Sequence, residues 1–111
     1  MADYSKEINM FKVLGDAKRT LIIDMLSCGE LCACSILEKF SFTQSTLSHH
    51  MKLLCGSGLV KARDEGKWTY YSLDPYGIDR VKKFLDNITA NKEDCICSGC
   101  KKSICEVKKH D

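Results

Sequence analysis

The feature that most constrains the fold is a change of hydrophobic period in the middle of the chain. Apolar positions first recur at the spacing of one helix face, at Leu47, His50, Met51 and Leu54. Gly56 and Gly58 then supply a stop for that helix. Beyond them the pattern alternates over residues 59–63 and 67–73, with turn residues at 64–66 between the two runs. The sequence therefore predicts a helix that leads directly into a β-hairpin.

Helical spacing on both sides of this unit completes the expected architecture. The central helix is predicted over 44–55, and further helices over 5–14, 16–28, 31–40 and 77–91. Asp16 and Thr43 suit the N-caps of two of them, and Pro75 is expected to separate the hairpin from the last helix. The predicted fold class is mostly α with a β-hairpin wing, a winged helix-turn-helix. We expect one domain over residues 1–93 and a cysteine-rich C-terminal tail over 94–111.

The helix over 44–55 carries small polar side chains on its outward face, namely Gln44, Ser45, Thr46, Ser48 and His49. Such side chains reach base edges and phosphates in a DNA major groove. The hairpin adds three long cations suited to backbone phosphates, Lys61, Arg63 and Lys67. His50 falls on the apolar face and is expected to be a packed core histidine. The periodicity fits a small α+β domain with a solvated hairpin equally well, and a net charge of +2 does not identify a nucleic-acid partner.

How the eight cysteines are interpreted depends on the cellular compartment, because the compartment sets their redox state. Residues 1–20 hold no apolar run that could act as a secretion signal, and no stretch reaches membrane-spanning length. We therefore expect a cytoplasmic protein with no membrane partner. Because the cytosol keeps thiols reduced, soft-ion binding or redox sensing is favoured over a disulfide framework.

Four blocks of sequence, 30–34, 44–54, 57–60 and 66–73, together resemble the ArsR/SmtB family of metal-responsive repressors. The blocks occur in the order that the family shows, and the resemblance covers roughly residues 5–90. It implies a homodimer whose first and last helices form the interface and whose partner is an inverted-repeat operator in double-stranded DNA. Apolar stripes on the two terminal helices fit this expectation, because a two-fold partner would bury them.

Cys32 and Cys34 stand two residues apart at the start of the helix predicted over 31–40. Residues 30–34 read Glu-Leu-Cys-Ala-Cys, which resembles the arsenic-sensing motif of arsenical repressors and implies trivalent arsenic or antimony as the inducer. On a regular helix, residues two apart lie about 200° apart around the axis. We therefore expect ion binding to unwind the helix start and to weaken operator binding. The alternative is that both cysteines are small buried hydrophobic residues.

The resemblance is incomplete at one position. Many arsenical repressors of this type have a third cysteine where this chain has Leu37. Pyramidal trivalent arsenic prefers three thiolates, and Cys28 is the nearest candidate for the third. Cys55 is expected to be structural, with a contribution to the site as the alternative. A site with two thiols would instead suit a trivalent organoarsenical, because its carbon already fills one position.

A second cluster lies in the tail and consists of Cys95, Cys97, Cys100 and Cys105. Four cysteines so close together favour a soft-ion site over packing, and zinc, cadmium, lead or a second arsenic would fit. The tail could instead be the sensor itself, through one of these ions or through thiol oxidation. Residues 77–91 contain no histidine, so the zinc site that other members carry on the last helix is expected to be absent.

A thiol enzyme is the contrasting class. Reductases of that kind need a reactive cysteine at the end of a strand, often as Cys-x-x-Cys, or beside a phosphate-binding loop. The spacing occurs at Cys97 and Cys100, where no strand is predicted to precede it, and the sequence has no glycine-rich phosphate loop. The chain is therefore predicted not to be an enzyme.

Overall fold

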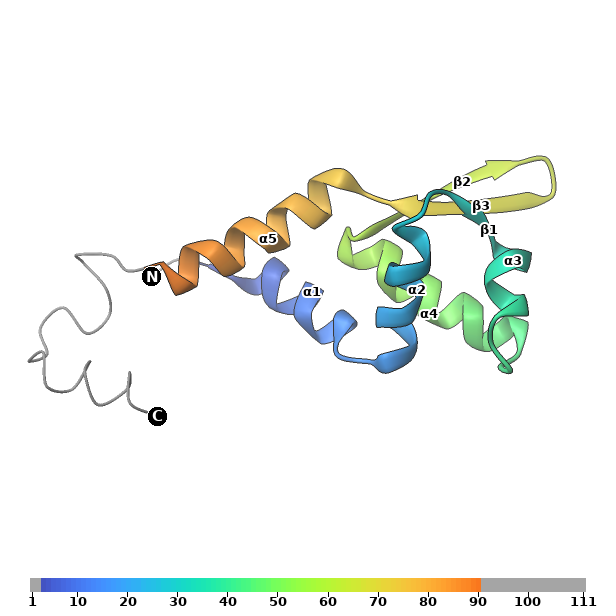
Figure 1. The fold of residues 1–111 in the computed structure, drawn as a ribbon, viewed down its shortest axis with the longest axis horizontal. Coiled ribbons are helices and arrows are strands. Elements are labelled where there is room, and N and C mark those ends of the chain that lie inside the picture. Colours follow the sequence, from blue (N-terminus) through green and yellow to red (C-terminus); the bar gives the residue numbers. More distant parts are fainter. Residues whose placement is uncertain (1–2, 91–111) are drawn as a thin grey trace, which may run out of the picture.

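The computed structural model describes residues 3–90. In that part of the chain, five helices and three strands follow the order α1 (Ser5–Leu14), α2 (Ala17–Leu26), β1 (Leu31–Cys32), α3 (Ala33–Glu38), α4 (Gln44–Ser57), β2 (Val60–Glu65), β3 (Trp68–Leu73) and α5 (Pro75–Thr89). The hairpin of β2 and β3 extends at one end of the molecule, and α5 runs beside α1 at the other (Figure 1). The predicted winged helix-turn-helix is confirmed. Between residues 3 and 90, no helix has both the length and the apolar character that a membrane span requires.

Side-chain caps determine where three of the helices begin. The side chains of Asp16, Thr43 and Asp74 each accept a hydrogen bond from a backbone N–H of the first turn that follows, at 2.8, 3.3 and 3.0 Å. The first two are the predicted caps. α5 begins at Pro75 rather than two residues later, because proline has a helical φ and lacks only an N–H that the first turn leaves unpaired.

The three strands form one antiparallel sheet in the order β1-β3-β2. β2 and β3 pair along their whole length up to Glu65 opposite Trp68, which leaves Gly66 and Lys67 as the turn. Gly66 has a φ of 62°, a left-handed value that favours glycine, and a glycine at this position of a short hairpin turn matches the twist of the strands. The tip of the wing is therefore a tight two-residue turn.

The segment predicted as the start of the third helix is a short strand. Leu31 and Cys32 pair with two tyrosines of β3, and α3 begins only at Ala33. Cys32 has an extended backbone, with φ −80° and ψ 155°. The prediction that Cys32 and Cys34 share a regular helix is wrong. The expectation that ion binding unwinds or bends the helix start was based on that geometry and loses its premise. Pairing with a distant strand overrides the local helical pattern here.

The hydrophobic core lies where α1 to α4 meet the base of the wing. Its most completely buried large side chains are Ile22, Ile36, Met51, Leu54 and Leu59. All four residues of the predicted inward face of α4 are buried as well. Because each large apolar side chain contributes about 1.5–3 kcal/mol when it is fully buried, this face holds α4 in one orientation against the rest of the domain.

α1 and α5 pack against each other and still leave apolar side chains uncovered. The Phe84 ring lies 5.0 Å from that of Tyr4 and 5.6 Å from that of Phe11, measured between centroids. Arg80 Nε donates to Glu7 Oε2 at 2.7 Å, which adds an ion pair between the two helices. Four large side chains of this pair remain between 38% and 49% exposed, namely Ile8, Phe11, Leu85 and Ile88. The single chain therefore does not complete the burial of this helix pair.

α5 begins directly against the end of α4. Gly77 approaches Gly58 so closely that a Cβ added at Gly77 would stand 1.8 Å from the Gly58 carbonyl oxygen. Gly58 closes α4 with a φ of 88°. The two positions therefore require glycine for different reasons, one for a close approach and one for a left-handed backbone.

Candidate nucleic-acid interface and thiol site

The outward face of α4 is the first part of the candidate interface. Gln44, Ser45, Ser48 and His49 are exposed, as the sequence predicts. Thr46 is half-buried, and its hydroxyl lies 3.2 Å from that of the capping residue Thr43. Four short or flat polar side chains thus stand free on a helix whose opposite face is fixed in the core, which is the arrangement a major-groove recognition helix needs.

The inward face of α4 carries a histidine that ties it to α2. His50 is 7% exposed, and its Nδ1 lies 3.2 Å from a guanidinium nitrogen of Arg19. Arg19 also donates to the Val13 carbonyl at 2.6 Å and pairs with Asp16 at 3.6 Å. Burial lowers the pKa of His50, which favours the neutral ring that can accept the arginine N–H. The prediction of a packed core histidine is confirmed.

The wing presents its cations unequally. Lys61 and Lys67 are exposed, and no ion pair involves either of them among the residues that the structure describes. Arg63 instead forms a bidentate ion pair with Glu30, with nitrogen–oxygen distances of 2.7 and 3.2 Å, and a further ion pair with Glu65. The hydrogen bonds from Arg63 hold the pKa of Glu30 below its usual value. The guanidinium of Arg63 is thus partly neutralised and links the wing to the segment just before β1.

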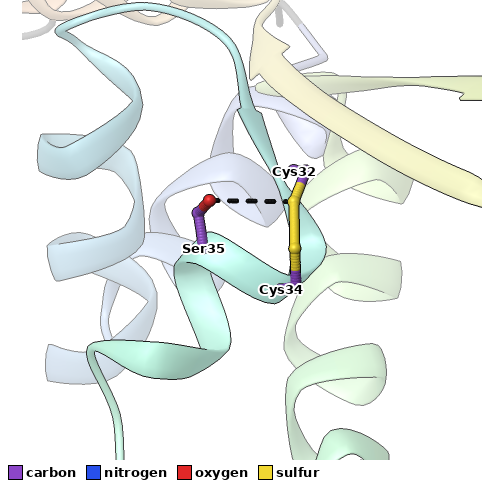
Figure 2. Close-up of a disulfide and its surroundings, with 3 residues drawn as sticks. All are labelled: Cys32, Cys34 and Ser35. Carbon is purple, nitrogen blue, oxygen red and sulfur yellow. Dashed lines mark hydrogen bonds between the residues drawn. A yellow bond between two sulfur atoms is a disulfide. The ribbon is translucent and has the colours of Figure 1, made fainter.

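Cys32 and Cys34 are joined in a disulfide, with their Cα atoms 5.4 Å apart (Figure 2). Cys32 comes from the extended end of β1 and Cys34 from the first turn of α3, so the two side chains converge from different backbone conformations. The Ser35 hydroxyl lies 3.7 Å from Cys32 Sγ. The two sulfurs therefore converge while α3 stays regular from Ala33 onward.

A cavity of about 290 Å³ lies between α3, the start of α4 and the tip of the wing. Its walls are formed by Ala33, Cys34, Leu37, Gln44, Leu47, Lys67, Trp68 and Thr69. One member of the thiol pair therefore shares a cavity with two of the predicted DNA contacts, Gln44 and Lys67. The sequence alone placed these two groups of residues in separate sites.

Within residues 3–90, the two other cysteines, Cys28 and Cys55, do not join this pair. Cys28 is exposed beyond the end of α2, and Cys55 is half-buried in α4, where burial raises the pKa of its thiol. Between residues 3 and 90, no three side chains among His, Cys, Asp and Glu are grouped so that they could hold a metal ion. The predicted tail ligands Cys95, Cys97, Cys100 and Cys105 lie outside the described residues.

Sequence reasoning missed the residues that connect these parts. Arg19 reaches His50 across 31 positions, and Glu30 reaches Arg63 across 33, so neither contact has a local signal. Trp68, in contrast, did carry a signal in the local sequence. It is the single tryptophan of the chain, it lies in the second predicted strand of the hairpin, and it is 51% exposed on the wing.

An exposed polar helix held by a core, followed by a basic β-hairpin, defines a winged helix-turn-helix DNA-binding regulator rather than an enzyme. The chain belongs to the arsR family of bacterial regulatory proteins, whose sequence profile matches residues 16–62. It is 41% identical over 102 residues to the arsenical resistance operon repressor of Staphylococcus aureus, covering 92% of this chain and 98% of that one.

Two further proteins place the chain in the same group. The arsenical resistance operon repressor of Staphylococcus xylosus is 43% identical over 102 residues, covering 92% of this chain and 98% of that one. The homodimeric winged helix-turn-helix DNA-binding domain Mb0332 of Mycobacterium bovis, solved in solution, superimposes with a TM-score of 0.64 at 25% identity. That match covers 79% of this chain and 89% of the other.

Proposed function

We propose that the protein represses an arsenical-resistance operon. A homodimer binds an inverted-repeat operator and releases it when trivalent arsenic or antimony binds the thiolates of Cys32 and Cys34. The observation that carries the proposal is the cavity in which Cys34 lies together with Gln44 and Lys67. The relatives named as arsenical resistance operon repressors support the same function.

DNA binding is assigned to two elements. α4 enters the major groove with Gln44, Ser45, Ser48 and His49 toward the bases, and Thr46 supports its first turn. Lys61 and Lys67 of the wing contact phosphates beside the groove. Arg63 can join them only by leaving Glu30 and Glu65, so its contribution to affinity is reduced by the pairs that it gives up.

The inducer acts on reduced thiols. Reduction of the Cys32–Cys34 disulfide yields two thiols on residues two apart, one in β1 and one in α3, and both are soft donors suited to trivalent arsenic or antimony. β1 is paired with β3, and Glu30 just before it is paired with Arg63 of β2. A change in the position of Cys32 therefore acts directly on the wing, while a change at Cys34 acts on the cavity beside Gln44. We expect both changes to lower operator affinity.

The two groups of DNA contacts should respond differently to substitution. Ser48→Ala and His49→Ala are expected to weaken binding to a duplex selected from a random pool by about 1–3 kcal/mol each, with little effect on unrelated duplexes. Lys67→Ala should weaken binding to all duplexes and lower the salt dependence by about one phosphate contact. Fluorescence anisotropy at several salt concentrations measures both effects. Lys82→Ala on the exposed side of α5 is the matched control, and an equal loss in that variant would contradict the assignment.

The proposed homodimer can be tested independently of DNA binding. Leu85 on α5 is 49% exposed in the single chain, and Leu85→Glu should weaken dimerisation at least about a hundredfold, because it buries an unpaired charge. Sedimentation velocity at micromolar concentration then shows a monomer. Leu21 on α2 is 51% exposed, so Leu21→Glu is the control that should remain dimeric. A Leu85→Glu protein that still dimerises would place the interface elsewhere.

A further inference from the structure

We propose that Arg19 and His50 position the recognition helix α4 for operator binding, and that a proton on the His50 ring releases this hold. The proposal rests on the proposed function, in which the exposed face of α4 contacts the operator. Both are positioning residues, because His50 is buried and the Arg19 side chain is only 15% exposed. The consequence is a repressor whose affinity for its operator falls as the medium becomes acidic.

The guanidinium of Arg19 joins three helices. Its Nε donates to the carbonyl of Val13 in the last turn of α1, at 2.6 Å. One of its terminal nitrogens lies 3.2 Å from Nδ1 of His50 on α4 and 3.6 Å from the carboxylate of Asp16, which caps α2. α4 is therefore held by a polar contact to α2 and to the end of α1, in addition to its apolar face.

The contact between Arg19 and His50 requires a neutral histidine ring. A guanidinium has only N–H donors, so Nδ1 must supply its lone pair and the ring proton must be on Nε2. A protonated ring carries N–H groups at both nitrogens and would place a second positive charge beside the guanidinium. Because the ring is buried, water screens this repulsion poorly. Protonation therefore replaces a hydrogen bond with a repulsion.

The surroundings of His50 determine the pH range of this change. Among the residues that the structure describes, four charged or titratable side chains of α2 and α4 act on the ring, namely Asp16, Lys18, Arg19 and His49. Burial is the largest influence and lowers the pKa of His50; the Asp16 carboxylate opposes it, and the other three lower the pKa further. The loop before α4 adds only an uncharged ring, that of Phe42, at 5.6 Å between centroids. The hold is therefore complete above about pH 6.5, the ordinary pKa of histidine, and is lost as the pH falls from there toward the lowered pKa.

The place of His50 within α4 links the proton to DNA binding. The next residue along the helix towards its start, His49, is exposed and is one of the proposed operator contacts, and the two rings lie 6.0 Å apart. Phe42, the other ring near His50, directly precedes the capping residue Thr43. Release of His50 from Arg19 therefore acts on the start of α4 and on a proposed base contact together. The fully buried Met51 and Leu54 keep the helix in the core.

The first test measures operator affinity by fluorescence anisotropy between about pH 7.5 and about pH 5. The reduced full-length reference protein carries His49→Asn and His110→Asn, so that His50 is its only histidine. Addition of His50→Asn supplies an amide oxygen near the position of Nδ1, which accepts a hydrogen bond and does not titrate. At about pH 7.5 the two proteins should bind the operator within about threefold of each other. On acidification, the reference protein should lose about three- to tenfold more affinity, since a pKa difference of one unit corresponds to tenfold.

The second test follows the His50 ring directly. Proton–nitrogen correlation spectra of the reference protein should show the Nε2–H tautomer at neutral pH. Arg19→Gln removes the neighbouring charge, so it should raise the pKa of His50 and move the midpoint of the affinity loss to higher pH by the same amount. Arg80→Gln, which removes the same charge from α5, is the matched control and should leave that pKa unchanged.

Three outcomes overturn the proposal: an equal loss of affinity in acid with and without His50→Asn, a ring protonated at Nδ1, or a pKa of His50 that Arg19→Gln does not raise. If circular dichroism shows that His50→Asn has not folded, the midpoint shift in Arg19→Gln decides the matter. The proposed function fails separately, if the reference protein at about pH 7.5 binds the selected duplex no better than unrelated duplexes.

Discussion

Cys32→Ser and Cys34→Ser are each expected to bind the operator as the wild type does and to lose its release by arsenite. The substituted side chains lie on β1 and in the first turn of α3, and neither is one of the proposed DNA contacts, so those contacts should persist. When one of the two thiolates is removed, the ion bound to the other no longer finds a second thiolate held nearby at high effective concentration. The arsenite concentration needed for release should therefore rise more than about a hundredfold. Anisotropy of a labelled operator, measured anaerobically after reduction, follows both properties.

Controls for this experiment come from the chain itself. Cys28→Ser and Cys55→Ser should respond to arsenite as the wild type does, because neither residue adjoins the pair in the structure. A chain that ends at residue 93 should also respond, since it keeps Cys32 and Cys34. Normal release by Cys34→Ser, or loss of release in the shortened chain alone, would assign sensing to the tail cysteines instead.

Gly77→Ala, a substitution in the first turn of α5, is expected to destabilise the fold strongly. The new Cβ would stand 1.8 Å from the Gly58 carbonyl oxygen, which is backbone and cannot move aside as a flexible side chain would. Relief requires α5 to shift against the end of α4, and we expect a loss of about 3 kcal/mol or more in the free energy of unfolding. Urea unfolding at one fixed protein concentration measures this, since dimerisation makes stability depend on concentration.

Gly56→Ala is the matched control for the same experiment. Gly56 lies in the last turn of α4, and nothing stands within 4 Å of a Cβ built there. Alanine has the higher helix propensity, so this variant should be unchanged or up to about 1 kcal/mol more stable. Equal stability of the two variants would mean that the contact between Gly77 and Gly58 yields without strain.

The recognition helix and the wing were predictable because their signals are local. The period of α4, its cap at Thr43 and the glycines after it lie within one short stretch, and so does the alternation of β2 and β3. β1 was not predictable, because a two-residue strand exists only through its pairing with β3. The same holds for the cavity beside Cys34, because residues of α3, α4 and the wing line it together. The sequence therefore indicated the DNA contacts and the cysteine pair, but not that the two lie close together.

The contact between Gly77 and Gly58 has a consequence for the operator. It attaches the first turn of α5 to the last residues of the recognition helix with no side chain between them. In a dimer built through α1 and α5, the separation of the two recognition helices is then set by rigid backbone rather than by an adaptable layer of side chains. Successive base pairs turn by about 34–36°, so one inserted pair rotates a half-site out of reach. We therefore expect the contact to restrict binding to operators of a single half-site spacing, which operators with one inserted base pair would test.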